Sequence, residues 1–341
     1  MPTPVSLLPR NRGLRAVAAA CLLLGALVLL AVPPVAARPR GSSNALAPRS
    51  LLSWKLPDGE ATILKVDGKE YRFAPQSFWA VDGRLQFVNR FTPFLVEYLP
   101  GKAVPQRVTP LVHGPDRKLE SRFFTDLQAP GPQAWLLEQS TATIRRADPD
   151  GAVDATWLLT DAQDAVITRF WPAGPAAFWL YDRARHLLML RRCDAPPDPD
   201  ADAPGADFPL SAESLAACEG HLVVADREGD ADWVITRRQA GDAATEPDVL
   251  AQLEADEVRI LDIDAAGTAF AYLRDGKGPA LLRLEIGKDP VRLPLPGAWR
   301  FPADAGRVAQ IVAAPGAVPS RLLVLLMRRP DEIALAEVAL P

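Results

Sequence analysis

The sequence predicts an all-β fold built from repeated antiparallel hairpins. Short apolar runs recur along the whole chain and are separated by Gly, Pro and Asp turns, which is typical of strands joined by tight connections. The chain also has 34 prolines in 341 residues. Because this is about twice the average share, it favours many short elements over long helices.

Each expected strand is an apolar run with turn formers on both sides. The first two hairpins turn at Asp67-Gly68 and Asp82-Gly83, because Asp-Gly supplies the positive φ angles that a two-residue turn requires. In chain order, the strands that we expect are 61–66, 71–73, 78–81, 85–88, 94–98, 135–138, 141–145, 155–159, 178–181, 187–190, 221–225, 233–236, 258–263, 268–273, 281–286, 308–312, 322–327 and 333–338.

The clearest of these hairpins lies in the middle of the chain. The apolar run Phe178–Tyr181 is followed by a polar break and by a second apolar run, Leu187–Leu190. Such continuous apolar runs predict strands that are buried on both faces.

The hairpins recur with a regular period. Comparable positions of successive units are separated by 57, 43, 44, 48 and 52 residues, and these positions are Phe78, Trp135, Phe178, Leu222, Phe270 and Leu322. A period of ~40–50 residues with three or four strands is typical of a propeller blade. We therefore expect a β-propeller of six or seven blades, with paired β-sandwiches as the alternative.

One unit carries a recognisable motif. The segment from Asp262 to Gly276, Asp-Ile-Asp-Ala-Ala-Gly-Thr-Ala-Phe-Ala-Tyr-Leu-Arg-Asp-Gly, resembles the blade repeat of bacterial TolB-type and WD-repeat-like propeller proteins. The other units share its spacing without the motif. The resemblance implies an architecture only, since propellers serve in binding, scaffolding, hydrolysis and redox chemistry.

The N-terminus indicates export. Arg10, Arg12 and Arg15 precede an uncharged apolar run over 16–37 that ends in Val-Ala-Ala. This pattern predicts a signal peptide over 1–37 or, if it is not cleaved, a membrane anchor that would be the chain's one contact with a membrane. Both place the body outside the cytoplasm, in the periplasm or beyond. Residues 38–50 are then expected to be a linker and 51–341 the propeller domain.

Charge argues against a nucleic-acid partner. Without residues 1–37 the chain keeps 35 basic and 42 acidic residues, a net charge of −7. An acidic surface gives no counterion-release drive toward DNA or RNA.

The two cysteines outside the N-terminal segment are disulfide candidates. Cys193 and Cys218 bracket an acidic, proline-rich segment, and in an oxidising compartment we expect them to be bonded to each other. The alternative is two independent thiols.

The segment between these cysteines is also an interaction-loop candidate. We expect it to project from between two blades and to bind a basic or cationic partner, with a spacer that has no partner as the alternative. A calcium loop is not expected, because Ala203 and Pro209 stand where such a loop needs Gly and Glu. The acidic residues concerned are Asp194, Asp198, Asp200, Asp202 and Asp207.

No sequence motif identifies a reaction. The chain lacks a nucleophile elbow, a phosphate loop, a dinucleotide fingerprint and a zinc motif, and His113, His186 and His221 lie far apart. We therefore expect no catalytic, cofactor-binding or metal-binding residues and no cofactor. The expected function is that of an exported, non-catalytic binding or scaffold propeller of the cell envelope. The alternative is a propeller hydrolase or lactonase with a divalent cation at the central channel.

Overall fold

The computed structural model describes residues 46–340 with several gaps. The positions within this range that it leaves undescribed are 67, 82, 121–122, 130, 160–163, 175, 194–206, 211, 219, 240–245, 303–304 and 315–316. The expected signal or anchor over 1–37 lies outside the described residues and stays a prediction. Among the described residues, no helix has the length and apolar character needed to cross a bilayer.

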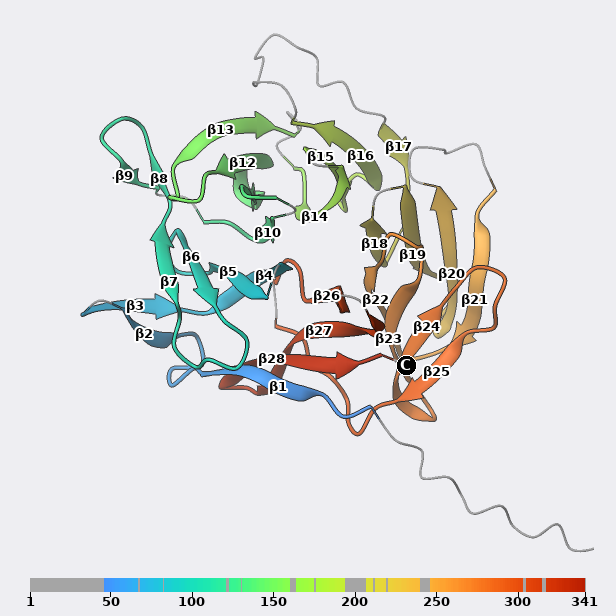
Figure 1. The fold of residues 1–341 in the computed structure, drawn as a ribbon. Helices are drawn as coiled ribbons and strands as arrows, with labels where there is room; N and C mark the ends of the chain where they lie inside the picture. Colours follow the sequence, from blue (N-terminus) through green and yellow to red (C-terminus); the bar gives the residue numbers. More distant parts are fainter. Residues whose placement is uncertain are drawn as a thin grey trace, which may run out of the picture. The chain divides into compact units, whose positions relative to one another are not determined.

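Six four-stranded antiparallel sheets form the blades of a propeller (Figure 1). Blade 1 comprises β4 (Pro75–Val81), β5 (Arg84–Asn89), β6 (Phe94–Tyr98) and β7 (Arg107–Pro110). Blade 2 comprises β10 (Asp126–Gln128), β11 (Ala134–Glu138), β12 (Thr143–Ala147) and β13 (Val153–Leu158). Blade 3 comprises β14 (Ile167–Gly174), β15 (Ala177–Asp182), β16 (Leu187–Arg192) and β17 (Asp207–Pro209).

The remaining three blades follow the same plan. Blade 4 comprises β18 (Ser214–Cys218), β19 (His221–Arg227), β20 (Asp232–Gln239) and β21 (Asp248–Glu254). Blade 5 comprises β22 (Glu257–Ile263), β23 (Ala269–Asp275), β24 (Gly278–Leu284) and β25 (Val291–Pro294). Blade 6 comprises β26 (Ala309–Ala314), β27 (Ala317–Arg329), β28 (Glu332–Ala339) and β1 (Arg49–Lys55). The propeller is thus confirmed with six blades, and the arrangement is not one of paired sandwiches.

Three small elements lie outside the six four-stranded sheets among the described residues. Two short hairpins flank blade 1 in the sequence, and a single 3-10 turn joins two strands of blade 2. They are β2 (Thr62–Val66) with β3 (Lys69–Phe73), β8 (Val112–His113) with β9 (Lys118–Leu119), and η1 (Gln139–Thr141). The β2–β3 turn has Gly68 at φ 75°, the left-handed conformation that the Asp-Gly signal predicts.

The first strands of the blades line the centre of the ring. Each contacts the first strand of the next blade, in the order β4, β10, β14, β18, β22, β26 and back to β4 (Figure 1). We call these six the inner strands. Because the ring closes, side chains from blades far apart in the sequence meet around one axis.

The N-terminal strand closes the ring. Strand β1 pairs antiparallel with β28, so blade 6 combines three C-terminal strands with one from the other end of the chain. Trp54 of β1 also donates a hydrogen bond from Nε1 to the Tyr98 hydroxyl of blade 1 at 3.1 Å and packs edge-on against Phe87. Strand β1 begins at Arg49, within the range 38–50 that is predicted to be a linker.

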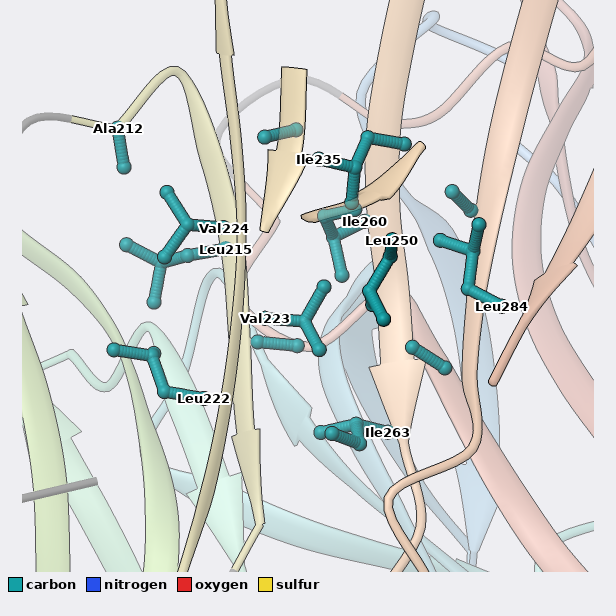
Figure 2. Packing of buried hydrophobic residues seen from close by; sticks show 14 of the residues in the cluster. Ala212, Leu215, Leu222, Val223, Val224, Ile235, Leu250, Ile260, Ile263 and Leu284 are labelled. Carbon is teal, nitrogen blue, oxygen red and sulfur yellow. The ribbon is translucent and has the colours of Figure 1, made fainter. Parts of the chain in front are cut away.

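Apolar clusters fill the spaces between blades. In blade 4 the consecutive residues Leu222, Val223 and Val224 are all buried, because one side of the sheet faces blade 3 and the other faces blade 5. Figure 2 shows part of the largest cluster, in which side chains of blade 4 lie against Ile260 and Ile263 of blade 5. This double burial explains why the strands appear as continuous apolar runs.

The unequal repeat intervals have a structural cause. Trp135, Phe178 and Phe270 lie in the second strand of their blades, whereas Phe78 lies in the inner strand β4. The corresponding second strand of blade 1 is β5, and the interval from Leu85 to Trp135 is 50 residues. The apparent interval of 57 residues thus compared two different strands.

Candidate functional site

The central channel contains a network of buried polar groups centred on Asp126. This aspartate begins the short inner strand β10 of blade 2 and is completely buried. Its Oδ1 accepts hydrogen bonds from Ser77 Oγ at 2.5 Å and from the Arg307 backbone N–H at 2.9 Å. Its Oδ2 accepts one from the Phe170 N–H at 3.1 Å. One carboxylate therefore joins blades 1, 2 and 3 to the segment that enters blade 6.

Arg307 extends the network across the channel. Its guanidinium donates to Asp262 Oδ1 of blade 5 at 3.3 Å and to Gln128 Oε1 of blade 2 at 3.2 Å. It also lies over the Trp79 ring, 4.8 Å from the ring centroid. Both members of the Arg307–Asp262 ion pair are nearly inaccessible to solvent, with side-chain exposures of 3% and 6%.

Burial also shifts the titration of these groups. Burial raises the pKa of Asp262, and this effect outweighs the attraction of Arg307 and the hydrogen bond that the Ile311 N–H donates to its Oδ2. Burial lowers the pKa of Arg169, on inner strand β14, to about 10. Removal from solvent is thus the largest influence on the pKa of both groups.

A cavity of about 260 Å³ borders this network, and Asp262 and Arg307 form part of its wall. It is lined by inner strands of blades 1, 3, 4, 5 and 6, mostly near their C-terminal ends, and we call it the mouth cavity. Its apolar lining includes Trp79, Pro172, Ala217, Ile263 and Ile311. Its polar lining includes Asp262, Asp264, Arg307 and Gln310. Apolar walls with a few fixed polar groups are typical of a binding pocket.

The wall of the mouth cavity is held rigidly. The Gln310 side chain spans from blade 6 to blade 1, where its Oε1 accepts from the Ala80 N–H at 2.7 Å and its Nε2 donates to the Ala80 carbonyl at 3.0 Å. Asp264, just after β22, accepts from the backbone N–H groups of Ala266 and Thr268 and fixes the turn that borders the cavity. These hydrogen bonds therefore fix two parts of the cavity wall.

The predicted disulfide is not confirmed. The described residues contain no disulfide, and Cys193 is buried whereas Cys218 is half-buried. Cys193 packs in the cluster between blades 2 and 3, and Cys218 packs against the cluster that joins blades 3, 4 and 5. The sheet of blade 3 lies between these two clusters. Only Cys218 reaches the mouth cavity.

The prediction that the acidic segment lies between two blades is wrong. Strand β17 begins at Asp207 and pairs with β16, so the segment lies within blade 3, between its third and fourth strands, and not between two blades. Asp194, Asp198, Asp200 and Asp202 themselves lie outside the described residues. Binding of a cationic partner there stays a prediction.

The three histidines do not meet. His113 contacts Glu120 with 3.7 Å between Nδ1 and Oε2, His186 lies 3.4 Å from the Tyr181 hydroxyl, and the His221 Nδ1 lies 2.9 Å from Arg237 Nη2. Within the described part of the chain, no group of three or more His, Cys, Asp or Glu side chains is placed to hold a metal ion.

The channel residues were not singled out from the sequence. Asp126 lies in a three-residue strand that has no apolar run in the sequence to predict it, and Arg307 lies just before strand β26 and not within a strand. The usable signal was a charged residue inside a buried strand, as with Asp262 between Leu261 and Ile263. The partner of such a residue could not be inferred, because Arg307 lies 45 residues from Asp262 and 181 residues from Asp126.

Comparison with known proteins leaves the function open. No protein-family model matches the chain. No curated protein matches it. The fold is found in solved structures, one of which is the Pan2 WD40 domain of Neurospora crassa, at 10% identity and a TM-score of 0.42 over 85% of this chain and 95% of that one. The β-propeller architecture is confirmed by the six blades of the structure itself, whereas a TolB-type relationship is not shown.

Two further similar structures differ in what they do. Virginiamycin B lyase from Staphylococcus aureus has 9% identity and a TM-score of 0.45, and the match covers 85% of this chain and 98% of that one. YCF48 bound to D1 peptide has 13% identity and a TM-score of 0.47, with 83% and 94% covered. At such identities and TM-scores, neither similarity says what this chain binds or catalyses.

Proposed function

We propose that this protein is an exported, non-catalytic binding propeller of the cell envelope that takes its ligand at the mouth cavity. The observation that carries the proposal is the cavity itself, which five blades line and which lies directly above the buried Arg307–Asp262 pair. Because the network below is held by hydrogen bonds between blades, the site does not have to be organised when a ligand arrives.

The size of the cavity limits what enters it. A volume of about 260 Å³ is slightly below the ~300–1,000 Å³ of pockets that enclose a whole small-molecule ligand. The site therefore suits a single group, such as one side chain or one terminus, of a larger partner that covers the surrounding face. Location in the envelope is supported by the N-terminal sequence pattern alone.

Two neighbouring alanines provide a matched test. Ala265 lines the mouth cavity and is exposed, whereas Ala266, the next residue of the same turn, is equally exposed and does not line it. Ala265→Trp should obstruct the cavity without disturbing the core, and Ala266→Trp should add the same bulk beside it. Purified wild type and both variants are used to capture partners from an envelope extract, and thermal unfolding verifies that all three fold.

The expected result is that wild type and Ala266→Trp retain the same partner and Ala265→Trp loses it. Equal capture by all three proteins would place recognition elsewhere on the blades.

A second assay distinguishes the proposed binding protein from the hydrolase alternative. If wild type hydrolyses lactones or esters in the presence of a divalent cation and Ala265→Trp does not, the non-catalytic part of the proposal is wrong.

A further inference from the structure

Arg169, on the inner strand β14, has two side-chain nitrogens without a hydrogen-bond partner among the described residues. Its Nε and Nη2 atoms are buried and have no hydrogen-bond partner among the described residues. The guanidinium lies over the Trp171 ring, 5.0 Å from the ring centroid. The indole therefore covers one face of the guanidinium. A buried donor without a partner costs about 1–3 kcal/mol, so two such donors on one arginine require an explanation.

A second arginine of the same chain shows what is missing at Arg169. Arg146 also stacks on tryptophan, 5.6 Å from the Trp157 ring centroid. Its Nε and Nη2 donate at 2.9 Å to the two carboxylate oxygens of Asp154. These are the two atoms that form the bidentate edge of a guanidinium. At Arg169 the same edge is present and no carboxylate of the described residues fills it.

Arg169 is a charged residue that lies among other charged groups. The charges that act on it are Asp126, Asp262, Arg259 and Arg307, from blades 2, 5 and 6. Arg169 remains protonated at neutral pH, since burial lowers its pKa only to about 10.

The other buried donors near the channel also lack acceptors. The indole Nε1 atoms of Trp79 and Trp171 and the Nε of Arg307 have no partner among the described residues. Trp79 and Arg307 both line the mouth cavity. All of these orphan groups are N–H donors, so the ligand that satisfies them must bring acceptor oxygens.

We infer that Arg169 is an anion-binding residue of the central channel and that the ligand presents a carboxylate to its Nε and Nη2 atoms. This inference rests on the proposed function, because it names the chemistry of the group that enters the channel. The two oxygens of a carboxylate match these two donors, as the carboxylate of Asp154 does at Arg146. Arg169 as a whole is half-buried, and Pro172 of the same strand lines the mouth cavity.

The inference is tested by NMR on the Nε–H signals of arginine side chains in the folded protein. The probes are propionate, acetyl-trialanine with a free carboxylate, the same peptide as its amide, and inorganic phosphate, with sodium chloride at equal ionic strength as the control. The Arg169 signal is identified by its loss in Arg169→Gln. We expect a saturable shift of this signal with at least one of the two carboxylates and none with the amide.

The pattern of shifts identifies the source of the carboxylate. A shift with propionate alone indicates a small free acid, and a shift with the peptide acid indicates a chain terminus. Affinity for the active probe should fall about 10- to 100-fold in Arg169→Gln, the usual effect of removing a charged hydrogen-bond donor. Arg169→Lys should restore only part of it, because lysine lacks the bidentate edge. Arg146→Gln, which removes the arginine that stacks on Trp157, should bind as wild type does.

Two outcomes overturn the inference. One is an Arg169 signal that responds to neither carboxylate. The other is a signal that responds only to inorganic phosphate, which would assign a different class of ligand. If Ala265→Trp still loses the captured partner in either case, the mouth cavity remains the binding site and only the anion site is wrong. If Ala265→Trp has no effect and Arg169 does respond, the channel binds carboxylates independently of the mouth cavity.

Discussion

At the scale of single residues, the channel depends on a few side chains that cannot be exchanged for close relatives. Asp126 accepts hydrogen bonds from three different parts of the chain, including Ser77 and Phe170. An oxygen that accepts several N–H and O–H groups cannot be replaced by an amide nitrogen, which only donates.

Asp126→Asn should therefore lower the free energy of unfolding by about 2 kcal/mol. The substituted amide turns one acceptor into a donor that faces N–H groups. The exposed Asp256→Asn is the control and should change stability by less than about 0.5 kcal/mol. Chemical denaturation measures both, and equal stabilities of the two variants would mean that the network does not stabilise the fold.

Gly306 leaves room for the same network. A Cβ at this position would lie 2.2 Å from the Thr125 carbonyl oxygen and 2.8 Å from Asp126 Oδ1. Gly306→Ala should destabilise the protein by about 3 kcal/mol, because the backbone oxygen cannot move aside cheaply. At Gly276 a Cβ would meet nothing within 4 Å, so Gly276→Ala should leave the melting temperature almost unchanged. A Gly306→Ala variant as stable as wild type would contradict the packing described here.

At the scale of elements, the pairing of β1 with β28 decides whether the ring stays closed. Glu337 of β28 receives a hydrogen bond from Arg49 of β1 at 2.5 Å and another from Arg321 of β27 at 3.0 Å. Burial alone would raise the pKa of Glu337, but the two arginines outweigh it, and the pKa lies below its ordinary value of 4.5.

This shift predicts a pH dependence of the closure. A carboxyl whose pKa is lowered on folding stabilises the native state above its ordinary pKa and loses that contribution as the pH falls through the lowered value. Glu337→Gln should therefore cost about 1 kcal/mol at neutral pH, and the difference from wild type should shrink once the pH falls below 4.5. The exposed Glu254→Gln is the control. If the stability difference between wild type and Glu337→Gln stays constant down to strongly acidic pH, the charge of Glu337 does not stabilise the pairing of β1 with β28.

The acidic segment of blade 3 is a second element that can be tested by itself. Deleting 195–206 leaves Cys193 and the strand β17 in place and removes most of the acidic residues of the predicted interaction loop. We expect the deletion to abolish capture of a cationic partner, and added salt to weaken that capture in wild type, because exposed charges are screened. Partners that are retained after deletion would support a spacer without a binding role.

At the scale of the whole molecule, export decides the environment in which the propeller works. The arginine-flanked apolar run over 16–37 predicts that the mature protein begins at or near Arg38. Intact-mass measurement on protein recovered from the envelope should give the mass of residues 38–341. A species that retains 1–37 and resists salt extraction would instead indicate an anchored protein.

The sequence alone determined the central hairpin of each blade but not the inner strands β10, β14 and β18. Turn signals such as Asp67-Gly68 and apolar runs such as Leu187–Leu190 act over a few residues, so the expected strands coincide closely with β2, β3 and β16. The repeat period also followed from local patterns. These features are readable because hydrogen bonding and burial within one hairpin depend on neighbours in the chain.

Only the tertiary structure decided which residues form the site. Asp126, Arg169, Asp262 and Arg307 come from four parts of the chain and meet because the ring closes. It also placed Cys193 in the cluster between blades 2 and 3 and Cys218 against the cluster that joins blades 3, 4 and 5. Closure by β1 determined the count of six complete blades. Such long-range pairings leave no local periodicity, since each depends on how complete blades pack around a common axis.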